Sequence, residues 1–128
     1  MIQDVEATLC DVCGRVLAAD EARTALLPDS SAVHPTRRDL DGLRPVSACG
    51  PDHLAAVTVE LSTRDWADEE LWAGQIVRAL TDAAPDTVGR AELARATSLS
   101  HEQIERAVTW HNTQIHRIGL AGHGPLPL

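Results

Sequence analysis

The apolar residues in the first half of the chain come in short runs that turn-forming residues interrupt. These runs predict short extended segments at 15–17 and 43–48, and the stretch 22–27 ends at a loop-forming sequence that begins with Pro28. Gly42, which follows an aspartate, indicates a turn because glycine adopts positive φ at little cost. The pattern therefore predicts a β-hairpin in this half of the chain.

Apolar residues at helical spacing begin near residue 51 and continue through most of the second half of the chain. The proline at this position suits the first turn of a helix. An acidic opening at 65–70 predicts the start of a second helix, which ends near Pro85, and a short third helix is expected at 88–97. Gly74 costs the second helix roughly 1 kcal/mol relative to alanine, which indicates a close packing contact there.

A last helix is expected to begin at His101, because Ser100 and Gln103 have the spacing of a capping box. At 100° per residue, its apolar positions fall on one face. This face consists of Ile104, Ala107, Val108, His111 and Ile115. The opposite face is polar and carries both acidic and basic side chains.

The composition limits the core that the chain can build. It contains no Phe, Tyr or Lys, so all 11 strongly basic residues are Arg, as in the high-GC coding bias of actinobacteria. An N-terminal half with so little apolar bulk would be marginal alone, and a bound metal then substitutes for a core. No apolar run approaches the roughly 20 residues of a membrane-spanning helix. We therefore expect a cytoplasmic protein without membrane association.

All three cysteines and one histidine form two pairs of candidate metal ligands. Cys10 and Cys13 belong to a Cys-x-x-Cys motif closed by Gly14, and a short turn of this kind aims both thiolates at one point. Cys49 and His53 are four residues apart, so on a helix they lie one turn apart on the same face. Three thiolates and one imidazole make a closed tetrahedral set for Zn²⁺ with no open position for substrate. The spacing predicts one structural zinc ion.

Other roles for these residues are weaker alternatives. The thiols could be free or buried without a metal, and a redox Cys-x-x-Cys would usually sit on a βαβ scaffold, of which the pattern gives no sign. Disulfides are disfavoured, because three cysteines cannot all pair and the N-terminus has no signal-peptide character. His34 could replace His53 as the fourth ligand.

The order of knuckle, hairpin and helix resembles a treble-clef zinc finger over residues 8–62. The resemblance rests on the two ligand pairs, and the chain departs from the commonest pattern in its Cys-x3-His pair and its long insert between the pairs. Treble clefs bind DNA, RNA or proteins, so the resemblance implies a fold and a metal without choosing a partner.

The stretch GRAELARATSLSHEQIERAVTWHNTQI resembles the helix-turn-helix of a winged-helix domain. The resemblance matches 101–116 to the recognition helix and 117–126 to the wing. It implies an α+β, mostly α protein, with a treble-clef-like zinc module at 1–62 and a winged-helix-like domain at 63–128.

A winged helix-turn-helix implies DNA binding through the polar face of its recognition helix. Arginine, glutamine and threonine side chains suit base edges, and further arginines suit phosphates. The candidates for bases are Gln103, Arg106, Thr109 and Thr113, and those for phosphates are Arg90, Arg95 and Arg117. Glu102 and Glu105 on the same helix oppose this assignment, because carboxylates repel phosphates.

The charge distribution along the chain also opposes DNA binding. Residues 1–87 carry a balance of −9 and residues 88–128 a balance of +1, for a net charge of −8. Such a chain binds nucleic acid poorly unless one face is locally basic.

Two functions follow from these patterns. The first is a small zinc-containing transcriptional regulator that binds DNA, and the alternative is a non-enzymatic adaptor that binds another protein through its acidic surface. A third interpretation is an accessory subunit with no activity of its own, and a homodimer is compatible with each. Catalysis is not expected, because the metal set is closed and no phosphate loop, nucleophile elbow or apolar carboxylate pair is present.

Overall fold

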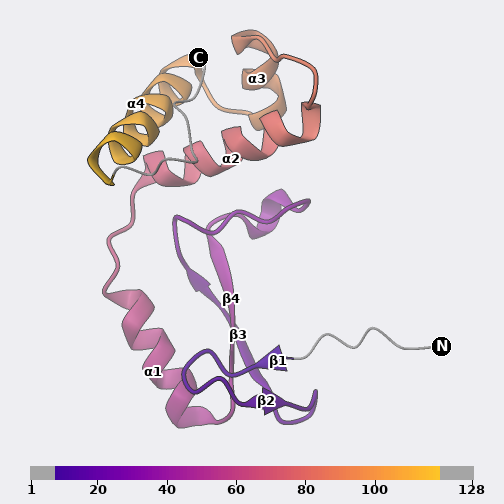
Figure 1. Ribbon diagram of the computed structural model, residues 1–128, viewed down its shortest axis with the longest axis vertical. Coiled ribbons are helices and arrows are strands. Elements are labelled where there is room, and N and C mark those ends of the chain that lie inside the picture. Colours follow the sequence, from indigo (N-terminus) through magenta and orange to yellow (C-terminus); the bar gives the residue numbers. More distant parts are fainter. Residues whose placement is uncertain (1–7, 119–128) are drawn as a thin grey trace, which may run out of the picture. The chain divides into compact units, whose positions relative to one another are not determined.

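The computed structural model describes residues 8–118 and has an α+β architecture. The described residues form four α-helices and two small antiparallel sheets, which confirms the predicted α+β class (Figure 1). The chain divides into two compact units. Unit 1 contains residues 8–29 and 43–65, and unit 2 contains residues 30–42 and 66–118. No helix within 8–118 is long and apolar enough to span a membrane.

Unit 1 begins with two very short strands that flank the first cysteine pair. β1 (Thr8–Leu9) and β2 (Val16–Leu17) pair in antiparallel fashion, with Leu9 opposite Val16. The chain can reverse between them because Gly14 has a φ of +75°, in the left-handed region that favours glycine. The two strands thus hold a turn of six residues that contains both thiols of the motif.

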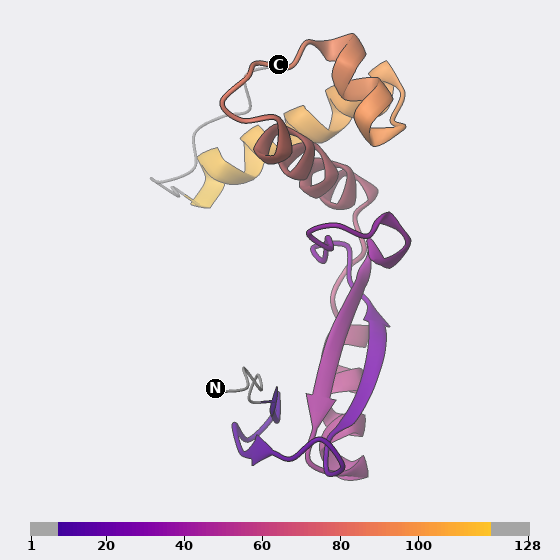
Figure 2. The ribbon, with the colours of Figure 1, turned by 90° about the vertical axis from the view of Figure 1, so that its right-hand side faces the viewer.

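The larger sheet of unit 1 pairs the strand expected at 43–48 with residues 23–28, which were not predicted as a strand, whereas the segment expected at 15–17 pairs with residues 8–9. β3 (Arg23–Pro28) pairs antiparallel with β4 (Leu43–Ala48), which confirms the extended segment expected at 43–48. α1 (Pro51–Ser62) follows directly and packs against both strands of the hairpin (Figures 1 and 2). Proline at the first helical position is favourable, since its missing N–H would have no partner there.

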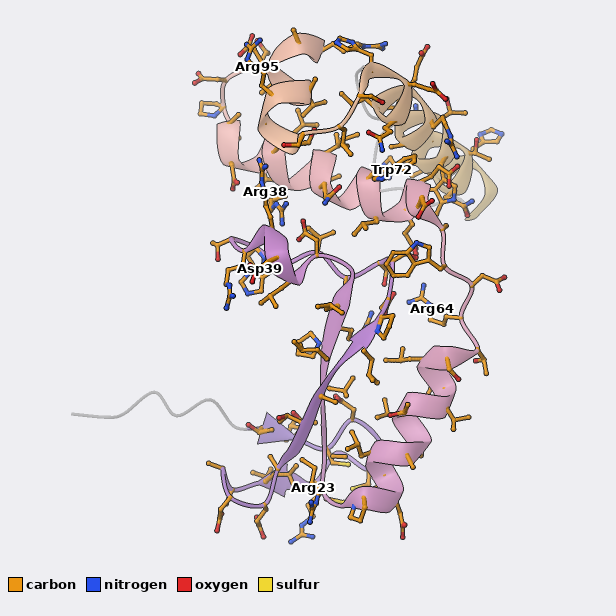
Figure 3. All side chains as sticks on the ribbon, turned by 180° about the vertical axis from the view of Figure 1, so that it is seen from behind. Arg23, Arg38, Asp39, Arg64, Trp72 and Arg95 are labelled. Atoms are coloured by element: carbon orange, nitrogen blue, oxygen red, sulfur yellow. The ribbon has the colours of Figure 1, made fainter. Side chains whose placement is uncertain are left out.

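Unit 1 has a small apolar core and one buried carboxylate. Its core cluster contains Cys10, Leu17 and Ala48, a set that includes a candidate metal ligand. The side chain of Asp29 is only 2% exposed and accepts hydrogen bonds from Arg44 and Arg64, at 2.5 and 2.9 Å. Arg64, marked in Figure 3, follows α1, so this carboxylate ties the end of the helix to the hairpin.

Unit 2 is a three-helix assembly with its own core. α2 (Asp68–Ala83) packs against α4 (His101–Ile118) and against the short α3 (Arg90–Thr97), as Figure 2 shows. Leucine and isoleucine side chains with no solvent exposure lie at its centre. The core cluster consists of Ala73, Ile76, Leu93, Leu99, Ile104, Ala107 and Val108.

The segment 30–42, which connects β3 to β4 along the chain, belongs to unit 2. It contacts α2 closely, because a Cβ added at Gly74 would lie 2.5 Å from a methyl carbon of Val33. The predicted close packing at this glycine is confirmed. The same segment contributes Asp41, whose carboxylate is held by a two-bond fork from Arg78 of α2.

Two expectations of detail need adjustment. The second helix begins at Asp68 and not at 65, because the Trp66 indole ring lies against Gly42, at 2.9 Å from the position of a Cβ there, and its N–H donates to the Asp68 carboxylate. The predicted wing at 117–126 lies almost wholly outside the described residues.

Candidate metal centre

The backbone of the first turn positions Cys10 and Cys13. The Cys10 N–H donates to the Arg15 carbonyl and the Gly14 N–H donates to the Cys10 carbonyl, both at 2.9 Å. The Asp11 N–H bonds the Ser47 carbonyl at 2.8 Å. The turn is therefore fixed on itself and against β4.

The junction of β4 and α1 positions the second pair. Cys49 directly follows β4, Gly50 is the helix N-cap residue in an extended conformation, and His53 lies in the first turn of α1. Strand pairing fixes the approach to Cys49, and the helix turns the imidazole back toward it. Cys49 precedes the helix, so the two residues do not lie one turn apart on it as expected from their spacing. The Cys49 Sγ and His53 Nδ1 atoms are nevertheless 3.1 Å apart.

The four predicted ligands meet in one group. The Sγ atoms of Cys10, Cys13 and Cys49 and the Nδ1 side of His53 give ligand atoms that all lie within 4.8 Å of one another. The measured separations are 3.5 Å from Cys10 Sγ to His53 Nδ1 and 3.9 Å between the Cys13 and Cys49 sulfurs. Tetrahedral Zn²⁺ bonds of about 2.3 Å to sulfur and 2.0 Å to nitrogen require ligand separations of roughly 3.5–3.8 Å. The group is therefore the right size for one metal ion.

The electrostatics of the group favour thiolate at one position. Hydrogen bonding from the Cys13 backbone, with further bonds from the Val12 and Cys49 backbones and from His53, lowers the pKa of Cys10 to about 5. Burial raises the pKa of Cys49, and the neighbouring sulfurs of Cys10 and Cys13 raise it further. Three sulfurs cannot all be ionised this close together without a compensating cation, and a bound divalent metal would supply that charge.

Exposure differs among the ligands. Cys10 is buried, Cys49 and His53 are half-buried, and Cys13 is exposed. The backbone of the turn is braced from the side by the Asp11 carboxylate, which accepts a hydrogen bond of 2.7 Å from the Ser47 N–H. One side of the centre thus faces solvent, and the other rests on the small core of unit 1.

His34 does not belong to this group. It lies in unit 2, and its Nδ1 accepts hydrogen bonds from the backbone N–H groups of Thr36 and Arg37, at 3.0 and 2.9 Å. The imidazole closes a turn there. The alternative in which His34 replaces His53 as ligand is therefore wrong.

The residues predicted to contact bases lie on α4, and most already have partners. The Arg106 guanidinium donates to the Glu69 carboxylate at 2.6 Å and lies 5.1 Å from the centre of the Trp72 ring. Gln103 completes the predicted capping box, since its side chain accepts from the Ser100 N–H at 2.8 Å. The Thr113 hydroxyl donates to the backbone carbonyl of Thr109, also at 2.8 Å.

The residues predicted to contact phosphates are more open. Arg90 and Arg95 on α3 are exposed, and Figure 3 shows Arg95 on the side of α3 away from α2. Arg117 is in the last turn of α4, and its side chain lies outside the described part of the structure. DNA binding through these residues stays a prediction.

Glu69 and Trp72 are the residues of this face that sequence reasoning missed. They come from α2, more than thirty positions before Arg106, so no spacing rule links them. The only available signal was the acidic opening of α2, which places three carboxylates in its first turn.

No protein-family model, curated protein or solved structure matches the chain.

Proposed function

We propose that the protein is a non-enzymatic adaptor, in which a structural Zn²⁺ supports unit 1 and the polar face of α4 in unit 2 binds another protein. The zinc assignment is supported by the donor set of three thiols and one imidazole, which suits Zn²⁺ better than hard cations such as Mg²⁺ or Ca²⁺. The set fills all four tetrahedral positions, so the metal would have a structural role.

The single observation that carries the adaptor function is the engagement of Arg106. This residue lies at the centre of the face that would read DNA, yet its guanidinium is bound by Glu69 and stacked on Trp72. The rest of the face carries the exposed carboxylates of Glu102 and Glu105. The net negative charge of this face would repel a phosphate backbone, whereas it would attract a protein partner of positive charge.

Two selections on the immobilised zinc-loaded full chain test this function. We expect a displayed library of random peptides to yield an enriched sequence family, and a pool of random duplex DNA to yield none at low salt. Enriched DNA sequences with no enriched peptides would overturn the adaptor function.

DNA binding remains a second candidate, because α3 and α4 follow each other through a tight turn at Ser98, which has a φ of +62°, in the order of a helix-turn-helix. In this case Arg106→Ala should lose affinity for a preferred site roughly tenfold. Arg90→Ala or Arg95→Ala should weaken all DNA sequences alike and flatten the salt dependence. Because the acidic N-terminal half repels phosphate, neutralising its carboxylates should also tighten non-specific binding.

A further inference from the structure

A cleft of about 480 Å³ opens on the polar face of α4 and is bordered by the start of α2. It combines carboxylates with the side chain of a tryptophan, a combination that the metal centre does not share. The lining residues are Glu69, Glu102, Glu105, Arg106, Thr109 and Trp110.

The charge in the cleft is negative and incompletely balanced. Arg106 is its single cation among the described residues, and it is already paired with Glu69 at 2.6 Å. Among residues 8–118, no hydrogen bond or ion pair engages the carboxylate of Glu102 or of Glu105. The three carboxylates of the lining therefore outnumber its one guanidinium, which is hydrogen-bonded to Glu69.

The molecule itself shows what such a combination binds. Next to the cleft, one carboxylate and one indole ring hold a guanidinium, since Arg106 pairs with Glu69 and lies 5.1 Å from the Trp72 ring centre. Cation–π and carboxylate contacts together favour arginine, whose planar fork stacks on a ring and donates to two oxygens at once. Glu102, Glu105 and Trp110 offer the same kinds of group in the cleft, and neither carboxylate forms a hydrogen bond or ion pair within residues 8–118.

We infer that this cleft receives an arginine side chain from a basic segment of a partner protein. The inference rests on the proposed adaptor function and names the chemistry of its partner. The volume of about 480 Å³ is large enough for an arginine side chain and adjoining peptide backbone. An acidic peptide, a phosphate group or a nucleic acid backbone would be repelled by Glu102 and Glu105.

A defined peptide tests the inference on the full zinc-loaded chain. The probe is an acetylated and amidated hexapeptide, Gly-Ser-Arg-Leu-Arg-Gly, titrated at low salt while the backbone amide resonances of 102–110 are followed by NMR. We expect saturable shifts in this segment. The double variant Glu102→Gln with Glu105→Gln should weaken binding by about tenfold or more, since it removes both charge partners.

A matched double variant removes the same charge elsewhere. Glu60→Gln with Glu92→Gln alters two exposed glutamates on α1 and α3 and gives the same net charge. We expect this control to change the affinity less than about twofold, because distant charges are screened. The peptide with both arginines replaced by lysine should bind about threefold more weakly. The peptide with both arginines replaced by citrulline, which is uncharged, should not bind.

Three results would overturn the inference, and they separate it from the adaptor function. If both double variants bind the peptide equally, charge alone and not the cleft is responsible. If the probe leaves 102–110 unshifted while selected peptides without arginine bind the chain, the cleft assignment fails and the adaptor function stands. If duplex DNA shifts the same resonances and no peptide does, both fail.

Discussion

The two units are stabilised by different means, and unit 1 is clearly the smaller of the two. In unit 1 the core cluster has three members, and one of them, Cys10, is itself a candidate metal ligand. In unit 2 the cluster has seven members, four of which have no exposure at all: Ile76, Leu93, Ile104 and Ala107. Unit 2 is therefore stabilised mainly by its buried apolar side chains, whereas unit 1 has a smaller core to which the proposed Zn²⁺ would add stability.

The difference extends to how the chain encodes each unit. The ligands of unit 1 come as two local pairs, and strand pairing brings the pairs together. Unit 2 depends on contacts between residues far apart in sequence, such as Asp41 with Arg78 and Arg106 with Glu69. The candidate metal ligands of unit 1 can thus be recognised from local sequence motifs, whereas the polar contacts of unit 2 form between residues far apart in the sequence.

Metal removal should produce the largest difference in stability between the two units. Structural zinc contributes on the order of 10 kcal/mol to folding in small zinc modules, so chelation should unfold unit 1 and leave unit 2 folded. All three tryptophans, Trp66, Trp72 and Trp110, lie in unit 2. We expect a strong chelator to remove the NMR dispersion of unit 1 without changing the tryptophan emission.

Two histidine variants control this experiment. His53→Ala removes a ligand and should lower the zinc content of the purified chain well below one per molecule. His34→Ala removes a histidine of unit 2 and should leave the zinc content unchanged. A loss of zinc in both variants, or a shift of tryptophan emission on chelation, would show that the units are not independent in this way.

The same contrast explains what the sequence could predict. The strand at 43–48 and the start of α4 at His101 follow from local spacing, capping and turn chemistry, and the structure confirms both. The spacing of the two pairs also predicts that Cys10, Cys13, Cys49 and His53 come together, as they do. The partners of Asp29, Asp41 and Arg106 cannot be predicted from local spacing, because each ion pair joins residues that are far apart in the sequence. His34 illustrates the limit, since its ligand-like chemistry is used to accept backbone hydrogen bonds in a turn.

The next largest effect should come from Asp41 in unit 2. Its side chain is 4% exposed and that of Arg78 is 14% exposed, and they are joined by a two-bond fork at 2.6 and 2.8 Å. Asp41→Ala leaves a half-buried guanidinium without its partner, which should cost about 3 kcal/mol in thermal or urea unfolding of unit 2. Arg37→Ala, which removes an exposed partner of Asp39, is the control and should change stability little.

Acid should weaken the same contact. Burial alone would raise the pKa of Asp41, but the hydrogen bonds from Arg78 and Gln75 outweigh it and hold this pKa below its ordinary value of 3.8. A carboxyl with a depressed folded-state pKa contributes its full stability above the unfolded value and loses it as the pH falls through the folded one. Tryptophan-detected unfolding of unit 2 should therefore weaken below about pH 4 in the native chain and much less in Asp41→Asn.

A smaller effect of unusual sign is expected at Gly74. In an exposed helix, Gly→Ala would stabilise by about 1 kcal/mol. Here the new methyl would lie 2.5 Å from a Val33 methyl carbon, so Gly74→Ala should destabilise unit 2 by about 1 kcal/mol. In a Val33→Ala background the same substitution should stabilise. If Gly74→Ala alone is stabilising, segment 30–42 yields easily and is not a fixed part of unit 2.

The smallest effect on stability, and the most informative one for function, concerns Arg106. The hydrogen bond from Arg106 lowers the pKa of Glu69, so Arg106→Gln should raise that pKa toward its ordinary value. The unfolding temperature should hardly change, because an exposed ion pair contributes little. An NMR titration of the Glu69 side-chain carboxyl carbon measures the shift, and Arg95→Gln, which alters an exposed arginine on α3, should leave it unmoved. An unchanged Glu69 pKa in Arg106→Gln would mean that this guanidinium is free in solution. The polar face of α4 would then present a cation to its partner, which favours DNA over the basic segment proposed for the cleft.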